Sequence, residues 1–399
     1  MEQQKTGPPA EELEARIAGL QSALRQKEMD GALIVQKTDL YYFSGTSQQG
    51  WLYVPAEGAP LLMVFKEYDR ARLESSLGHV ISLVSPKKIP GALQEHGYSL
   101  PTTLGMELDV LPANLYFQFC SIFEGCNIVD VATPIRLIRA VKSAYELERM
   151  RKAAAFSDQV AAKLADLLEE GRTEVAVAGE LEAYARGLGH QGIVRMRMFG
   201  SELFYGHLMS GPAAAVPSYL ASPTGGEGVS EVIGQGAGYK TIGRNEPILV
   251  DYVFAHNGYI SDHARIFVLG ELDAELARAH DDMLAIQEKI KKEAVPGAAT
   301  GEMYQMMVDM AADQGHEQSF MGVGERRIRF TGHGVGLELD EFPFIAKGQK
   351  LELAEGMVIA LEPKVILPGK GVVGIENTHL VTRNGLEPLT RFPDEICKL

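Results

Sequence analysis

The feature that most constrains this chain is the placement of acidic residues inside apolar hairpin patterns. The first such segment is ILVDYVFAHNGYISDHARIFVLG, in which two strands are predicted to meet at a tight turn at 256–258. Asp251 and Asp262 lie eleven residues apart, nearly symmetric about that turn. Because strand side chains alternate between faces, both carboxylates are expected on one face, opposite or diagonal to each other.

A second segment, MVIALEPKVILPGKGVVGIENTHLVT, repeats this geometry around a turn at 368–370. Glu362 and Glu376 are symmetric about Gly369 and are again expected on one face. Like charges that face each other within apolar strands are unfavourable, and burying an unpaired carboxylate is costly. Bound cations would remove this penalty, since two divalent ions balance four carboxylates.

One histidine completes the candidate site. His333, in FTGHGVGLELDEFP, lies between glycines that allow close approach of backbone and metal. Taken singly, each of these five residues is more often a turn, surface or loop residue, but two symmetric carboxylate pairs with a histidine are a much rarer coincidence. Oxygen ligands with one imidazole suit Mn(II), Fe(II), Co(II) or Zn(II). Two ions roughly 3.5–4 Å apart would bridge a water, lower its pKa and polarise a carbonyl.

The length of 399 residues predicts two domains. In the first, we expect a helix over 11–28, a short strand in DGALIV, a strand in TDLYYFSGT that ends at Gly45, and a hairpin in WLYVPAEGAPLLMVF, with further α/β alternation to about residue 138.

In the second, helices are predicted over 144–171, 173–188, 272–293 and 300–314, with strands near 193–197, 203–210 and 246–254. Residues 211–240, rich in Gly, Pro and Ser, predict either an ordered loop over a site or a mobile lid.

Composition excludes several classes of protein. The net charge of −15 argues against nucleic-acid binding, which needs a basic surface. No window reaches the roughly 18 unbroken apolar residues of a membrane span. The first thirty residues contain no apolar core followed by a small-residue cleavage site, so we expect no secretory signal. The three cysteines, Cys120, Cys126 and Cys397, are too few for a disulfide framework, so we expect a reducing, cytoplasmic location.

The motifs resemble the pita-bread metallohydrolases: methionine aminopeptidase, aminopeptidase P, prolidase and creatinase. That family has an Asp on a strand, a second Asp eleven residues later in S-D-x-T-R, a His in G-H-G-x-G-L, a Glu in x-E-P and a Glu in I-E-D-T. This chain has Asp251, SDHAR with Asp262, GHGVGL with His333, LEP with Glu362 and IENT with Glu376. The segment 136–154 resembles the junction before the catalytic domain of prolidase and aminopeptidase P.

The resemblance implies an α/β (α+β) chain with an N-terminal creatinase/prolidase-type cap domain over 1–138 and a pita-bread catalytic domain over 139–399. It implies two divalent metal ions (Mn, Co, Fe or Zn), a metal-bridging hydroxide that attacks the scissile carbonyl, Glu362 as proton shuttle, and a homodimer.

The chain departs from the family around these ligands. Family peptidases have a second His seven residues after the ligand His, where this chain has Asp340, and another in a P-H-G motif, where it has Ser218. The threonine of S-D-x-T-R is Ala264 and the Arg two residues before the final Glu is Gly374. The residue after that Glu is Asn377 instead of Asp.

The missing histidines would have donated hydrogen bonds to the substrate carbonyl and the developing oxyanion. Asp340 cannot donate while ionised, but it can hold a substrate amine or act as a general base. His207 is the main candidate for a replacement donor. His263 is expected to point to the opposite face from Asp262, and Tyr205 and Arg265 are weaker candidates. Glu341 is interpreted as a supporting or surface residue.

The main hypothesis is a metallopeptidase of the Xaa-Pro type, a dipeptidase or aminopeptidase that acts on short peptides, with Glu362, Asp340 and His207 as catalytic residues. Tyr205, His207 and Asp340 are the candidate substrate-binding residues. The alternative is a small-molecule enzyme on the same scaffold, either a creatinase-like C–N hydrolase or a dimethylsulfoniopropionate-lyase-like enzyme with Asp340 as base, because a fold does not fix a function.

Overall fold

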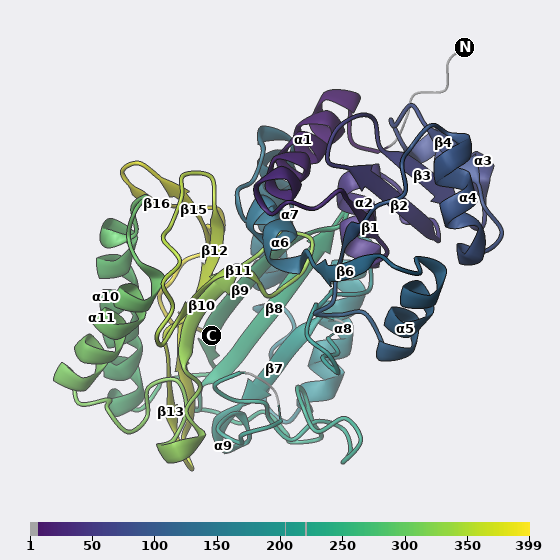
Figure 1. The fold of residues 1–399 in the computed structure, drawn as a ribbon. Coiled ribbons are helices and arrows are strands. Elements are labelled where there is room, and N and C mark those ends of the chain that lie inside the picture. The colour runs from purple at the N-terminus through teal and green to yellow at the C-terminus, as the bar shows by residue number, and fades with distance from the viewer. Residues whose placement is uncertain (1–6, 204, 220–221) are drawn as a thin grey trace. The chain divides into compact units, whose positions relative to one another are not determined.

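The chain divides into two units, Met1–Arg139 and Ala140–Leu399. The structure is a computed structural model that describes residues 7–203, 205–219 and 222–399. Each unit has its own sheets (Figure 1). Each also has its own hydrophobic core.

The N-terminal unit is built on a mixed six-stranded sheet with the order β4-β3-β2-β1-β5-β6. The expected hairpin in 51–65 is confirmed, since β2 pairs antiparallel with β3. Its elements are α1 (Ala10–Gln26), β1 (Gly31–Ile34), α2 (Lys37–Ser44), β2 (Gly50–Pro55), β3 (Leu61–Val64), α3 (Tyr68–Glu74), β4 (Val80–Ser82), η1 (Pro86–Lys88), α4 (Ile89–Glu95), β5 (Thr103–Met106), α5 (Ala113–Ile122), β6 (Asn127–Asp130) and α6 (Ala132–Ala140).

The strand predicted in TDLYYFSGT is wrong, because this segment forms helix α2. The Gln36 side chain accepts a hydrogen bond from the Asp39 N–H and caps the helix start, and Gly45 ends it in the left-handed conformation at φ 77°. Leu40 and Phe43 are buried three positions apart, which is helical spacing. The run of aromatic and apolar residues favoured a strand locally, but the caps and this spacing determine the helix.

The C-terminal unit contains two main sheets, β17-β9-β8-β7 and β11-β10-β12-β15-β16, and the hairpin β13-β14. The elements are α7 (Ala144–Leu164), α8 (Glu174–Gly187), β7 (Gly206–Ser210), α9 (Gly211–Ala214), β8 (Ile248–His256), β9 (Tyr259–Val268), α10 (Ala274–Glu293), α11 (Thr300–Asp313), η2 (Gly324–Arg326), β10 (Phe330–Gly334), β11 (Glu341–Ala346), β12 (Val358–Leu361), β13 (Lys364–Leu367), β14 (Gly371–Gly374), β15 (Asn377–Thr382), β16 (Gly385–Pro388) and β17 (Cys397–Lys398).

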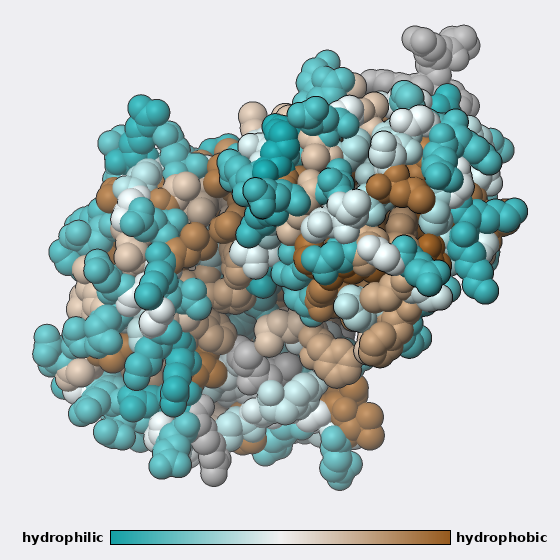
Figure 2. All heavy atoms as spheres, viewed as in Figure 1, coloured by the Kyte–Doolittle hydropathy of each residue, from teal (hydrophilic) through white to brown (hydrophobic). Residues whose placement is uncertain are grey.

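A pair of helices covers each main sheet of this unit. Helices α7 and α8 pack on β7, β8 and β9, whereas α10 and α11 pack on the strands from β10 to β16 (Figure 1). The outward surface of α10 and α11 is largely hydrophilic (Figure 2), as expected for helices whose apolar side faces a core. A bridge between Ala264 and Glu376 joins the two halves at the point where β9 lies beside β15.

The strand register confirms the predicted placement of the carboxylate pairs. In the β8–β9 hairpin, Asp251 pairs with Ala264 and Val253 pairs with Asp262, so the two aspartates are diagonal on one face. In the β13–β14 hairpin, Lys364 pairs with Gly374. Glu362 and Glu376 each lie two residues beyond that pair, at equivalent positions on the two arms.

Two further expectations concern the segments before β8. The strand predicted near 193–197 is wrong, because this segment makes only an isolated bridge between Val194 and Leu203. Within the described part of 211–240 the chain forms the short helix α9, the isolated bridge between Ser230 and Ile233, and otherwise turns and irregular structure.

Among the described helices, none combines the length and the hydropathy needed to cross a membrane.

Candidate metal centre

Three side chains from three separate strands or strand ends converge in the C-terminal unit. Asp262 comes from β9, His333 from β10, and Glu376 from the link between β14 and β15. Each offers a ligand atom, these atoms lie within 4.8 Å of one another, and all three residues are buried. Glu362 follows β12 and adds a fourth buried ligand beside them, because its N–H donates to Thr331 O on β10 and keeps it next to His333.

The His333 ring is oriented by backbone carbonyls. Its Nδ1 lies 3.0 Å from Leu339 O and 3.1 Å from Gly334 O, so Nδ1 carries the proton that these acceptors require. The lone pair of Nε2 then faces the carboxylates, at 3.6 Å from Asp262 Oδ2, 3.9 Å from Glu362 Oε1 and 3.9 Å from Glu376 Oε1. A backbone acceptor that fixes the far nitrogen is the usual arrangement of a metal-binding histidine.

The electrostatics of this cluster favour a bound cation. Burial raises the pKa of Asp262 well above its usual range, and the neighbouring carboxylates Glu376 and Asp251 raise it further. Burial also raises the pKa of Glu376 to about 7, against the opposing effect of the Lys364 ammonium. A divalent ion among these oxygens and Nε2 would relieve the repulsion. The residues therefore fit one such ion.

Lys364 is the residue of this centre that the sequence interpretation missed. Its Nζ lies 2.6 Å from Glu376 Oε2, 3.0 Å from Asp251 Oδ2 and 3.1 Å from Glu362 Oε2, and the residue is 1% exposed. Burial lowers the pKa of Lys364, but the three carboxylates more than reverse this and hold it well above its usual value. Strand alternation was the available signal, because it places Lys364 on the same face as Glu362, two residues earlier.

A cavity of about 250 Å³ opens onto this centre. Its wall includes Asp251, Asp262, His333, Glu362 and Glu376 together with Asp340 and His207, and apolar side chains such as Met198 and Leu339. All five sequence-predicted ligands and two of the candidate substrate-binding residues thus line one cavity. A pocket with an apolar wall and a few convergent charged groups is typical of an active site.

The sequence profile of "Metallopeptidase family M24" matches residues 148–383, more than half of the chain, and that of "Creatinase/Prolidase N-terminal domain" matches residues 16–141. The chain therefore belongs to metallopeptidase family M24.

Similar proteins cover nearly the whole of this M24 chain. A relative from Pyrococcus furiosus, named Xaa-Pro dipeptidase, is 28% identical over 96% of this chain and 100% of its own length. The crystal structure of the prolidase from Pyrococcus horikoshii has a TM-score of 0.80 at 26% identity, over 95% of this chain and 99% of the other. The Xaa-Pro dipeptidase from Bacillus anthracis, at 22% identity, has a TM-score of 0.83 over 97% and 100%. The predicted pita-bread fold is thereby confirmed.

Asp340 and His207 line the cavity together with the converging carboxylates and His333. Asp340 Oδ1 lies 3.6 Å from His333 Nδ1, and its side chain is partly exposed to the cavity. His207, on β7, pairs with Asp251 on β8. Its Nε2 is buried and has no hydrogen-bond partner among the residues that the structure describes. Burial lowers the pKa of His207, although the nearby Asp251 acts in the opposite direction.

Tyr205 and Ser218 are not among the described residues that line the cavity. The Tyr205 ring stacks on His190, with centroids 4.3 Å apart. Ser218 Oγ donates to Gly234 O at 2.7 Å, within the loop.

His263 and Glu341 do not line the cavity, and each contacts another part of the C-terminal unit. His263 points away from Asp262, as expected, with Nδ1 3.1 Å from Ser157 Oγ on α7. Glu341 is buried, pairs with Lys142 at 3.0 Å and accepts the Leu337 N–H.

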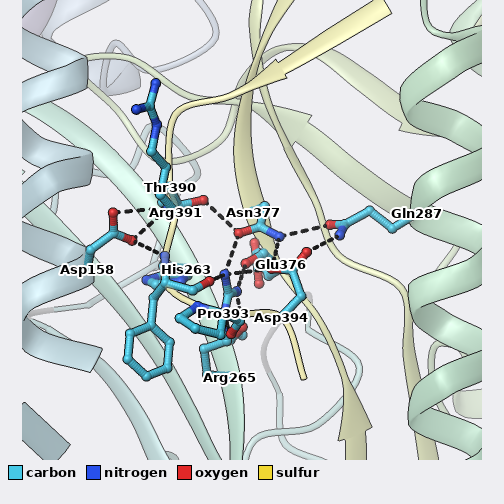
Figure 3. A network of polar contacts seen from close by, with 12 residues as sticks. Asp158, His263, Arg265, Gln287, Glu376, Asn377, Thr390, Arg391, Pro393 and Asp394 are labelled. Atoms are coloured by element: carbon cyan, nitrogen blue, oxygen red, sulfur yellow. Dashed lines mark hydrogen bonds and ion pairs between the residues drawn. The ribbon is translucent and has the colours of Figure 1, made fainter. Parts of the chain in front are cut away.

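Arg265 holds the backbone of Glu376 in place through a network of hydrogen bonds (Figure 3). This side chain is 1% exposed, and its Nη1 donates to Glu376 O at 2.9 Å. Its Nη2 donates to Asn377 Oδ1 and Asp394 Oδ1, each at 2.8 Å, and Nε donates to Pro393 O at 2.8 Å. The planar guanidinium therefore fastens β9, the Glu376 backbone and the segment 392–394 together.

We expect Arg265→Lys to destabilise the protein by about 2–4 kcal/mol, because an ammonium cannot reproduce the planar set of hydrogen bonds and leaves buried acceptors unsatisfied. Thermal unfolding would show a fall in Tm of roughly 5–10 °C. Arg151→Lys is the matched control, since Arg151 makes an exposed ion pair with Glu387, and its effect should stay within about 0.5 kcal/mol. Equal Tm values for both variants would contradict this role of Arg265.

Proposed function

We propose that this chain is a metal-dependent peptidase that cleaves the bond before proline in short Xaa-Pro peptides. The observation that carries the proposal is the convergence of Asp262, His333, Glu362 and Glu376 on one wall of the cavity. Membership of family M24 supports metal-dependent peptide hydrolysis. The names of the full-length relatives, Xaa-Pro dipeptidase and prolidase, support this substrate class.

The proposed ion is held by carboxylate oxygens of Asp262, Glu362 and Glu376 and by Nε2 of His333. This donor set suits manganese, cobalt, iron or zinc. When bound, such an ion polarises the substrate carbonyl and makes a water more acidic at neutral pH. The second ion expected from the sequence would have to share its carboxylates with the Lys364 ammonium.

Glu362 is proposed to move the proton during hydrolysis. Its Oε1 lies on the His333 side of the cluster, whereas its Oε2 lies 3.1 Å from Lys364 Nζ. The Lys364 contact fixes the carboxylate, so Oε1 can take a proton from the attacking water and deliver it to the leaving proline nitrogen.

His207 is proposed to donate a hydrogen bond to the substrate carbonyl. Its Nε2 has no partner among the described residues, although a buried nitrogen without one is costly. A substrate oxygen in the cavity would satisfy it, and the bond would strengthen as negative charge develops on that oxygen. This would replace the donor that the family places at the positions of Ser218 and Asp340.

Asp340 is proposed to bind the free amine of the substrate. Its carboxylate is partly exposed to the cavity and comes from the loop between β10 and β11. A cavity of about 250 Å³ suits a ligand of about dipeptide size. Restriction of substrate length by the N-terminal unit, the substrate-binding role of Tyr205, a homodimer and a cytoplasmic location stay predictions from the sequence.

Glu362→Gln should lower kcat on an Xaa-Pro dipeptide by at least about 1,000-fold, because the amide cannot accept the proton. The exposed Glu355→Gln should retain activity, and removal of metal from the wild-type chain by a chelator should abolish it until ions are returned. The measurement is proline release across a panel of Xaa-Pro peptides. If the metal-loaded wild type is inactive on the whole panel, the peptidase proposal fails and the small-molecule hydrolase or lyase becomes the better hypothesis.

His207→Ala should lower kcat by about 100-fold with little change in KM, because the lost hydrogen bond is stronger in the transition state than in the ground state. Steady-state kinetics with the same dipeptide test this, with the exposed His79→Ala as control. A variant with unchanged kcat would show that His207 does not assist the reaction.

Asp340→Asn should raise KM for a free Xaa-Pro dipeptide about tenfold, since the variant loses the ion pair with the substrate amine. An N-acetylated substrate, which has no charged amine, should bind wild type and variant equally. Asp340→His supplies the reverse test: a gain of Xaa-Pro cleavage in this variant would mean that the native carboxylate serves another substrate.

A further inference from the structure

The position of Lys364 bears on the number of ions that the centre can hold. Glu362 and Glu376 each direct one oxygen to a different side. Their Oε1 atoms lie 3.9 Å from His333 Nε2, whereas their Oε2 atoms lie 3.1 Å and 2.6 Å from Lys364 Nζ. These two carboxylates therefore bridge two cation positions, and an ammonium occupies one of them.

The two positions differ in their remaining contacts. Asp262 and His333 belong to the first, where their ligand atoms and that of Glu376 lie within 4.8 Å of one another. Asp251 belongs to the second, because its Oδ2 lies 3.0 Å from Lys364 Nζ. Lys364 Nζ thus donates hydrogen bonds to Glu362 and Glu376 and forms an ion pair with Asp251. A divalent ion bound there would need the same oxygens at about 2 Å and would collide with Nζ.

A glycine lies opposite Lys364 in the β13–β14 hairpin. Gly374 is the cross-strand partner of Lys364 and has φ 149°. A Cβ at position 374 would overlap Pro363 O and would lie 2.7 Å from Lys364 Cα and 3.0 Å from Lys364 Cγ, so the backbone alone requires a glycine here. Position 374, where the family pattern has arginine, therefore carries no side chain next to the stem of Lys364.

We propose that Lys364 takes the place of the second metal ion and that this chain binds one divalent ion, at Asp262, His333, Glu362 and Glu376. The Lys364 ammonium carries one positive charge and is part of the chain. A second divalent ion at this position would carry two positive charges and could dissociate. Four carboxylates, one ion and one ammonium leave one net negative charge, and Asp340 adds another carboxylate. A substrate with a free amine would offset this charge, whereas an anionic substrate would be repelled.

Metal stoichiometry tests the proposal on the full chain. Each protein is stripped of metal, loaded with excess Mn²⁺, separated from free ions and analysed by elemental mass spectrometry. We expect one ion per chain for the wild type and two for Lys364→Ala, which frees the oxygens of Asp251, Glu362 and Glu376. Lys370→Ala, in the exposed turn of the same hairpin, is the matched control and should bind one ion.

Two ions in the wild type, none in the wild type, or one in a folded Lys364→Ala variant would each overturn the proposal. Electron paramagnetic resonance of the Mn²⁺-loaded wild type needs no variant: an isolated six-line spectrum is expected, and an exchange-coupled spectrum would contradict a single ion. The proposal rests on the metal site of the proposed function. Because an ion count needs no substrate, failure of the peptidase activity and failure of this inference are distinguished.

Discussion

The mutual repulsion of four closely spaced carboxylates, three of them buried and that of Asp251 partly buried, is the constraint on which the C-terminal unit depends. Asp251, Asp262, Glu362 and Glu376 come from two hairpins far apart in sequence, and each would be costly to bury alone. Lys364 offsets part of this repulsion, because its ammonium lies between Asp251 of β8 and the two glutamates that flank the β13–β14 hairpin. These strands pack together through a shared apolar core, which includes Leu249, Ile266, Leu361 and Val365.

Much of this arrangement follows from the sequence because strand geometry is so regular. The period of two placed Asp251 and Asp262 on one face, and symmetry about Gly369 matched Glu362 with Glu376. The same rule places Lys364 on the face of Glu362, but a single lysine in an apolar strand does not indicate that three carboxylates surround it. The helix α2 was missed for a different reason: its aromatic composition favours strands locally, whereas its stability comes from a cap at Gln36 and a left-handed glycine at Gly45.

Contacts between side chains on different elements could not be predicted from the sequence. Nothing in the order of residues indicates that the Tyr205 ring stacks on His190, or that His207 stands beside Asp251 with an unpartnered nitrogen. These contacts depend on how loops close, which no local period encodes. The proposed ligand positions match the family pattern, whereas the residues beside them, such as Lys364 and Asp340, differ from it.

The Arg265 network has a consequence for the order in which the protein can be made. The guanidinium that holds the Glu376 backbone is itself completed by Pro393 and Asp394, more than a hundred residues beyond Asp262 in the chain. The four acidic residues of the centre are therefore synthesised before the residues that complete this network. The hydrogen bonds that position the Glu376 backbone become complete only once residues 392–394 have left the ribosome.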